Sequence, residues 1–191
     1  ARGGNGYSPE IVDPNEIIPE IIDATIDSLI ITEKAKKLRY TTDLGEIPKI
    51  EVDPKILSRG IENLVSNAAE ASSYSGLVEV RTSYEVIDQL TKPLVGSLER
   101  GEYVKIEITD TGRGIASEKI PEIFKPFYTE RADRTKGTGL GLLIVQNLIE
   151  KSGGALNVVS ELNQGTTFEL YFPAHNEYII CNIPTILPLG F

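Results

Sequence analysis

Cysteine and histidine are almost absent from this 191-residue sequence, which holds one of each, Cys181 and His175. A single cysteine cannot form an internal disulfide, and this pair cannot build a Cys/His metal cluster. Basic residues are also few, because 19 Lys and Arg stand against 28 Asp and Glu, for a formal net charge of -9. This balance argues against general binding to a phosphate backbone, so we expect no nucleic-acid partner.

Long apolar runs are missing as well. No stretch is long enough to span a bilayer, and the start of the chain does not look like a signal peptide. We therefore expect a cytoplasmic domain without direct membrane contact, although the cytoplasmic part of a membrane-bound sensor would look the same. A hydrophobic content of 40% and a charged content of 25% are ordinary for one globular domain of this length.

Composition divides the chain into an ordered middle and two ends. Residues 1–12 are rich in glycine and carry no pattern, so we expect a disordered segment or a remnant of expression. One domain should span residues 13–175, and the apolar tail 176–191 has no role that we can assign. Asp13 and Asp53 each precede a proline and predict helix starts, but Pro19 predicts a kink or a later start in the first helix.

Helical and alternating patterns fill the predicted domain. Further helices are expected from residue 55 to about 72 and from 140 to about 152, and a short one near 117–121. Strands are expected at residues 38–44, 49–52, 77–87, 102–109, 155–160 and 166–172. The segment 88–101 reads as a polar hairpin loop, and residues 129–138 read as a mobile loop.

The stretch Asp110-Thr111-Gly112-Arg113-Gly114-Ile115 follows one of these strands. A carboxylate at the end of a strand can accept a hydrogen bond from the exocyclic amine of a planar ligand. Gly112 and Gly114 let the backbone come close to that ligand. On its own, however, the pattern also describes an ordinary turn.

Asn63, Asn67 and Glu70 stack along one face of the helix that begins near residue 55. Asn is unfavourable inside helices, which leaves a solvated face or a ligand site as the explanation. A neutral amide oxygen suits Mg²⁺ that already carries triphosphate oxygens.

The run Gly137-Thr138-Gly139-Leu140-Gly141 opens the next long helix, whose free N–H groups and dipole favour phosphate. It matches neither the Walker loop nor the dinucleotide motif, and a plain helix start is the alternative.

Together these stretches resemble the Bergerat-fold ATPases, the superfamily of gyrase, heat-shock chaperone, histidine kinase and MutL. The predicted helix that carries Asn63 and Asn67 resembles the N box of this superfamily. The Asp110 stretch resembles its first glycine box, and the Gly137 run resembles its second glycine box. Phe124-Lys125-Pro126-Phe127-Tyr128 resembles the F box of sensor histidine kinases, and Gly165-Thr166-Thr167-Phe168 the closing Gly-Thr element. Five boxes in the family's order make chance agreement negligible.

The resemblance implies ATP and Mg²⁺ as ligands. Asp110 would bind the adenine amino group with a water held near Thr166, and Asn67 would bind Mg²⁺. The remaining nucleotide-binding positions implied by the boxes are Gly112, Gly114, Ile115, Phe127, Gly137, Thr138, Gly139, Leu140 and Gly141.

Three residues are candidates for the chemistry: Asn63, Asn67 and Lys136. Asn63 stands where gyrase-like relatives place a water-activating Glu. Because an amide is no base at neutral pH, we expect poor hydrolysis and a phosphate kept for transfer. Glu62 lies about 100° round the helix and does not replace it. Arg131, Arg134 or Lys136 of the predicted lid would reach the γ-phosphate, unless these charges are simply solvated.

The resemblance implies the catalytic domain of a sensor histidine kinase, which transfers phosphate in line from Mg·ATP. Its partners would be a separate dimerisation domain that carries the acceptor histidine, and a response-regulator receiver domain. Two alternatives stay open, an ATP- or ADP-sensing regulatory module and a Ser kinase of the anti-sigma type. The implied fold is α+β, an α/β sandwich with helices on one face of a mixed, mostly antiparallel sheet.

Overall fold

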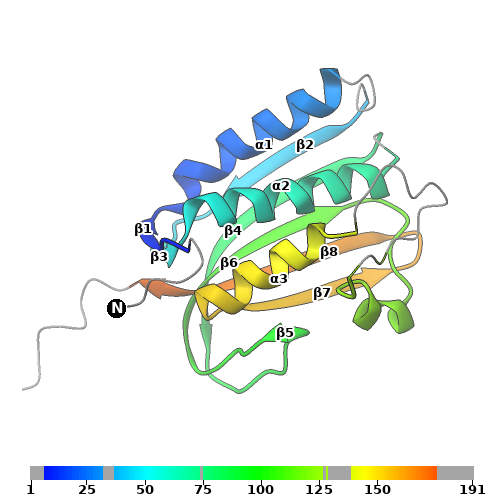
Figure 1. Cartoon of the computed structure of the whole chain (residues 1–191). Coiled ribbons are helices and arrows are strands. Elements are labelled where there is room, and N and C mark those ends of the chain that lie inside the picture. Colours follow the sequence, from blue (N-terminus) through cyan, green and yellow to red (C-terminus); the bar gives the residue numbers. More distant parts are fainter. Residues whose placement is uncertain (1–6, 32–36, 74, 127, 129–138, 176–191) are drawn as a thin grey trace, which may run out of the picture.

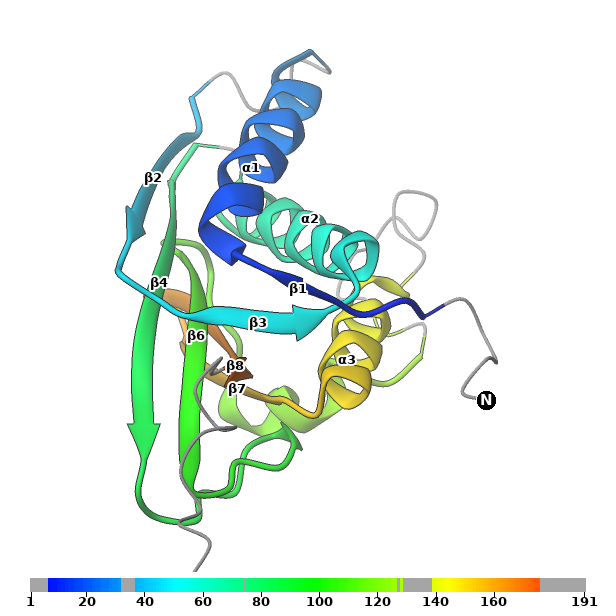
Figure 2. The same cartoon turned by 90° about the vertical axis from the view of Figure 1, so that its left-hand side faces the viewer.

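An eight-stranded sheet covered on one face by helices forms the domain in a computed structural model of the chain (Figures 1 and 2). The structure describes residues 7–31, 37–73, 75–126, 128 and 139–175. The helical elements are α1 (Pro14–Ile31), α2 (Pro54–Ala71), the 3-10 helix η1 (Ser117–Glu122) and α3 (Gly141–Ser152). The strands are β1 (Glu10–Val12), β2 (Arg39–Leu44), β3 (Lys49–Val52), β4 (Leu77–Ile87), β5 (Val95–Gly96), β6 (Gly101–Asp110), β7 (Ala155–Glu161) and β8 (Gly165–His175).

The order of strands in the sheet is β1-β3-β8-β6-β4-β2, with β7 paired to β8 and β5 paired to β7. Only β2 and β4 run parallel among these pairs, and the others are antiparallel. This confirms the mixed, mostly antiparallel sheet with helices on one face that the sequence predicts.

Aspartate caps and a terminal glycine set the bounds of the helices. The Asp13 carboxylate accepts a hydrogen bond from the N–H of Asn15 (2.8 Å), and α1 begins at Pro14. It continues through Pro19, so the predicted later start is wrong. A proline in a helix omits one backbone hydrogen bond, and the rest of the buried stripe still packs. α3 ends at Gly153, which adopts the left-handed conformation (φ 64°).

Asp53 holds the start of α2. Its carboxylate accepts from the N–H groups of Lys55 (3.0 Å), Ile56 (3.3 Å) and Ser8 (2.8 Å). These hydrogen bonds, that of Ser8 first, hold the pKa of Asp53 below its ordinary value. The segment before β1 is thus tied to the N-terminus of α2. Tyr7 extends this tie, because the Lys151 ammonium of α3 lies 5.4 Å from the centre of its ring.

The core lies between the helices and the inner face of the sheet. Every second residue of the central strands points inward, and the members with at most 8% exposure on β4, β6 and β8 include Val78, Val80, Val104, Ile106, Ile108, Phe168, Leu170 and Phe172. Gly60 of α2 brings that helix close to α3, since a Cβ there would lie 2.7 Å from Leu148 Cδ2.

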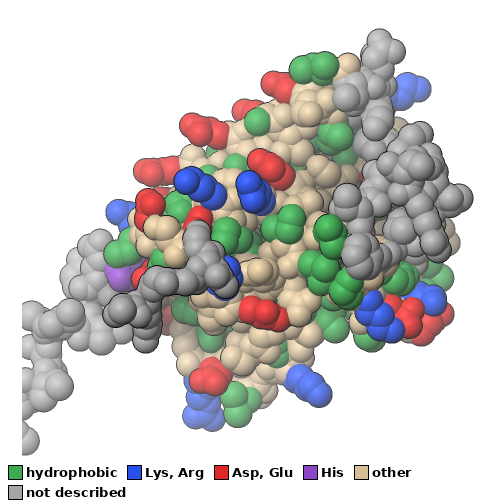
Figure 3. All heavy atoms as spheres, viewed as in Figure 1, with side chains coloured by type: hydrophobic (Ala, Val, Ile, Leu, Met, Phe, Trp, Pro, Cys, Tyr) green, Lys and Arg blue, Asp and Glu red, His purple; other side chains and the backbone are tan. Residues whose placement is uncertain are grey.

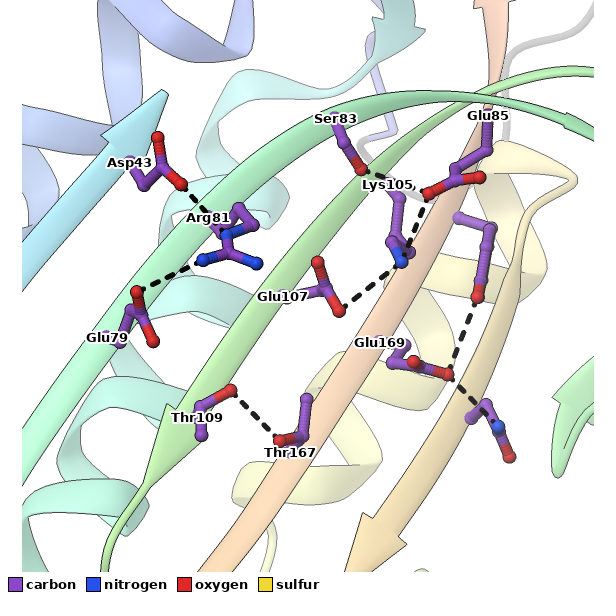
Figure 4. A network of polar contacts seen from close by, with 12 residues as sticks. Asp43, Glu79, Arg81, Ser83, Glu85, Lys105, Glu107, Thr109, Thr167 and Glu169 are labelled. Atoms are coloured by element: carbon purple, nitrogen blue, oxygen red, sulfur yellow. Dashed lines mark hydrogen bonds and ion pairs between the residues drawn. The ribbon is translucent and has the colours of Figure 1, made fainter. Parts of the chain in front are cut away.

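The opposite face of the sheet carries a network of polar contacts (Figure 4) and a small apolar cluster of Leu98, Tyr103 and Ala155. Lys105 bridges Glu85 (3.2 Å) and Glu107 (3.3 Å), and Thr109 pairs with Thr167 across β6 and β8 (2.9 Å between hydroxyl oxygens). On the helical side, Asp and Glu side chains gather along α1 (Figure 3). No helix in the described part of the chain has the length and apolarity needed to cross a membrane.

Two short strands correct the sequence prediction. Residues 10–12 are not part of a disordered segment as predicted, because β1 pairs with β3. The predicted polar loop 88–101 contains β5, which pairs with β7. Strands of three and two residues are too short to show an alternation of polar and apolar side chains.

Candidate functional site

Asp110 occupies an inward-facing position at the end of β6. The preceding inward residues of the strand are Val104, Ile106 and Ile108, so the pattern calls for another apolar side chain there. The register places Asp110 between Val78 of β4 and Thr166 of β8. A carboxylate therefore stands in line with the apolar core, facing the helices.

Burial decides the electrostatics of this carboxylate. Asp110 is 4% exposed. Burial raises its pKa from the ordinary 3.8 to about 6, while hydrogen bonds from the N–H groups of Gly112 and Thr166 and the charge of Arg113 pull the pKa in the other direction. One bond, from Gly112 N to Oδ1, measures 2.7 Å. A buried carboxylate with a raised pKa is a good acceptor for a ligand that brings its own donors.

Glycines allow the loop after β6 to lie against its neighbours. Gly114 has a positive φ of 67°, and a Cβ there would collide with the backbone carbonyl of Glu161. A Cβ at Gly112 would collide with the backbone of Ala71 at the end of α2. These two glycines thus allow close approach to protein backbone, and the predicted close approach to a ligand stays a prediction.

The end of β7 and the turn between β7 and β8 form hydrogen bonds with the same loop. Asn163 N–H donates to the Arg113 carbonyl (2.8 Å), and Ile115 N–H donates to Ser160 Oγ (2.7 Å). Ser160 Oγ also lies 2.9 Å from Thr166 Oγ1. Sequence reasoning missed Ser160, since a serine on a predicted strand carries no motif signal. The structure joins it to both Ile115 and Thr166.

One face of α2 connects the two glycine-containing segments. Asn63, Asn67 and Ala71 follow at intervals of four residues and so lie one above another. At one end, a Cβ on Gly141 would lie 2.8 Å from Asn63 Oδ1. At the other end, the Ala71 carbonyl accepts from Arg113 N–H (3.2 Å). Asn67 thus lies between the start of α3 and the Asp110 loop, about 6 Å along the helix from each neighbour in this row.

The two Asn side chains differ in their partners. Asn63 Nδ2 donates to the Arg59 carbonyl one turn earlier (2.7 Å). Asn67 is half-buried, and we find no hydrogen bond from its amide to any residue that the structure describes. Among the described residues, Asn67 is therefore the one of the two whose whole amide is without a hydrogen-bond partner.

The start of α3 offers backbone donors. Its capping residue, Leu140, makes no side-chain capping bond, and Gly139 before it has a positive φ of 65°. The first N–H groups of a helix have no partner within it and carry the positive end of its dipole. Gly141 brings these groups against Asn63 of α2.

Four predicted site residues, Phe127, Lys136, Gly137 and Thr138, lie outside the described residues, as do the predicted lid and the tail 176–191. The remaining ones gather around the end of β6, the face of α2 and the start of α3: Asn63, Asn67, Asp110, Gly112, Gly114, Ile115, Gly139, Leu140, Gly141 and Thr166.

A family model described as "Histidine kinase-, DNA gyrase B-, and HSP90-like ATPase" matches residues 52–176. The chain belongs to this family of ATPases. The match runs from β3 to the end of β8 and so includes every described residue of the candidate site. As a member of this family the chain is an ATP-binding domain.

Relatives of this ATPase domain are sensor histidine kinases. The sensor histidine kinase ZraS of Escherichia coli K12 is 32% identical over 176 residues, covering 87% of this chain and 33% of ZraS. The sensor kinase CckA of Brucella abortus is 30% identical over 166 residues, covering 86% of this chain and 17% of CckA. The chain thus spans about a third or less of the length of these two relatives.

Solved structures agree with the fold. Full-length ShkA in complex with AMPPNP is similar with a TM-score of 0.67 and 26% identity, covering 92% of this chain and 33% of ShkA. The nucleotide-free catalytic domain of the histidine kinase ThkA has a TM-score of 0.67 at 23% identity, covering 87% of this chain and 96% of that domain. The α+β sandwich inferred from the sequence is therefore confirmed.

Proposed function

We propose that this ATPase domain binds Mg·ATP between α2, α3 and the end of β6, and that within a sensor histidine kinase it transfers the γ-phosphate to a histidine of a separate dimerisation domain. The observation that carries the proposal is the row of Asn63, Asn67 and Ala71 on α2. Asn67, whose amide has no hydrogen-bond partner among the described residues, lies in this row between the buried Asp110 carboxylate and the start of α3, which has no side-chain cap in the described part of the chain.

The Asp110 carboxylate would receive the adenine amino group. The buried carboxylate has lost hydrogen bonds to water, and the amino group of the ligand would supply a hydrogen bond in their place. Such a bond is strong because the acceptor is ionised. Thr166 of β8 lies directly opposite Asp110 of β6 and would hold a water molecule next to the adenine base. The loop 112–115 would form the adjoining wall.

The phosphates would lie toward the start of α3, and Asn67 would be the protein ligand of Mg²⁺. In the described residues there is no group of three or more His, Cys, Asp or Glu suited to a metal. A site with one neutral amide fits Mg²⁺ that is held mainly by phosphate oxygens and water. When bound, the metal neutralises charge on the phosphates.

Transfer rather than hydrolysis follows from the chemistry of Asn63. Its amide is bonded to the Arg59 carbonyl and has no basic lone pair with which to activate water. Lys136 would contact the γ-phosphate. The one histidine of the sequence, His175, ends β8, so the acceptor would belong to a dimerisation domain and the phosphate would pass on to a receiver domain.

Calorimetry of ATP binding with and without Mg²⁺ tests the site. Wild type should bind in the micromolar range, Asp110→Asn should lose binding in both conditions, and Asn67→Ala should lose mainly the gain due to Mg²⁺. Matched controls are Asn147→Ala, an exposed Asn of α3, and Glu107→Gln on the polar face of β6 (Figure 4). Absence of binding by wild type, or normal binding by both site variants, would refute the site.

Phosphotransfer is tested separately with a supplied dimerisation domain of a sensor kinase and labelled ATP. Label on the acceptor histidine supports the kinase. Tight ATP binding without any transfer to several such domains would instead favour a nucleotide-sensing regulatory module.

A further inference from the structure

Ser160 stands at the junction of three segments that form the candidate adenine site. Its hydroxyl oxygen accepts from Ile115 N–H at 2.7 Å, lies 3.0 Å from the Gly165 carbonyl oxygen and 2.9 Å from Thr166 Oγ1. These contacts link the loop after β6 to the first residues of β8. Thr166 in turn is 4% exposed and directly opposite Asp110, which puts the two Cβ atoms about 5 Å apart.

The direction of these bonds follows from the Gly165 carbonyl, which can only accept and so takes the hydrogen of Ser160. A serine hydroxyl donates once and accepts at most twice. When Ser160 donates to the Gly165 carbonyl, it accepts from Ile115 N–H and from the Thr166 hydroxyl, and all its capacity is used. The hydrogen of Thr166 then points at Ser160, and the lone pairs of Thr166 remain for a donor beside Asp110.

We propose that Ser160 is a positioning residue for base recognition, which keeps Thr166 an acceptor and so favours adenine over guanine. With Thr166 oriented in this way, it and Asp110 together present only acceptors. The 6-amino group of adenine, or a water that donates to both, matches this arrangement, whereas guanine offers an oxygen at the same place. Ser160 also supplies the acceptor for Ile115 N–H. This inference rests on the proposed ATP site.

Ser160→Ala tests the role through the identity of the base. The variant frees the Thr166 hydroxyl to rotate and removes the acceptor of Ile115 N–H. We expect ATP affinity to fall about tenfold, the effect of one hydrogen bond, while purine riboside triphosphate, which lacks the amino group, loses less than about threefold. The ratio of the affinity for ATP to the affinity for GTP should fall. All three nucleotides are titrated by calorimetry, with circular dichroism as the check on folding.

Two further variants keep the test decisive. Thr167→Val removes a hydroxyl from the next residue of β8 on the polar face, where it pairs with Thr109, and should leave all affinities unchanged (Figure 4). Ser160→Cys replaces the hydroxyl by a larger thiol that forms only weak hydrogen bonds, and it is measured in place of Ser160→Ala if that variant unfolds. It should show the same pattern.

The outcomes separate this role from the proposed function. A loss of equal size for all three nucleotides means that Ser160 only supports the local structure, and an unchanged ATP affinity removes its role altogether. Either result overturns the Ser160 inference and leaves the ATP site standing. No nucleotide binding by wild type overturns the proposed function itself.

Discussion

The buried carboxylate of Asp110 should make the stability of the nucleotide-free domain fall as pH rises. Its pKa is about 6 in the folded protein, against an ordinary value of 3.8. The folded state therefore binds the proton more tightly than the unfolded state does, so the contribution of this group to folding is most favourable below about pH 4 and decreases up to about pH 6. This sign is opposite to that of an aspartate stabilised by a salt bridge.

The magnitude follows from the two pKa values. A difference of about two pKa units corresponds to about 3 kcal/mol over the whole titration, and about 2 kcal/mol of this falls between about pH 4.5 and about pH 7.5. Asp110→Asn has no titrating group at this position but keeps an oxygen for Gly112 N–H. The free energy of unfolding of wild type minus that of Asp110→Asn should thus decrease by about 2 kcal/mol over this range, because the other titrating groups cancel.

Urea denaturation followed by circular dichroism at several pH values measures the difference. The Asn variant's own stability at one pH does not matter, because only the change with pH reports the Asp110 proton. A difference that stays constant, or that increases with pH, would show that the carboxylate is not held at a raised pKa and would refute the reasoning. Saturating ATP should reduce the change, since a donor at the carboxylate stabilises its ionised form.

Two further predictions concern the backbone around the site. Gly114→Ala should lower the free energy of unfolding by more than about 3 kcal/mol, because the new Cβ would collide with the Glu161 backbone. Gly153 has a similar positive φ but open space around it, so Gly153→Ala should lower the free energy of unfolding by only about 1 kcal/mol. Equal losses for the two variants in urea titrations would contradict the packing argument. Asp53→Ala should lower the free energy of unfolding by about 1–2 kcal/mol, because α2 loses its N-terminal cap. The control, Asp27→Ala at an exposed position of α1, should lower it by less than about 0.5 kcal/mol. If thermal unfolding shows an equally small effect for both variants, the Asp53 cap does not stabilise the domain.

The parts of the domain that sequence could predict are those with a local signal. The caps Asp13 and Asp53 and the terminal Gly153 mark helix ends, and alternation marks β4, β6 and β8. Asp110 was also readable as a candidate, because a carboxylate stands at the end of a predicted strand and is followed by two glycines. Its raised pKa was not readable, since it depends on burial by elements distant in sequence.

Long-range contacts account for what the sequence did not show. β1 and β5 are defined by their partners β3 and β7 rather than by their own residues. Ser160 matters because a turn brings it to Ile115, 45 residues earlier in the chain. The interval of four residues between Asn63 and Asn67 was visible, but the place of Ala71 in this row and the contacts with Gly141 and Arg113 required the structure.

The position of β8 has a consequence for how the chain folds. This strand follows the other strands of the described chain in sequence, yet it pairs with β6, β7 and β3 in the middle of the sheet. Until β8 is in place, β3 and β6 have no common neighbour, and Asp110 lacks the strand that pairs with its own. Contacts of such high sequence separation close late and slow folding. On the ribosome, the helices and the β4–β6 hairpin would therefore form before the nucleotide site exists, and the site would be completed only when the last strand enters the sheet.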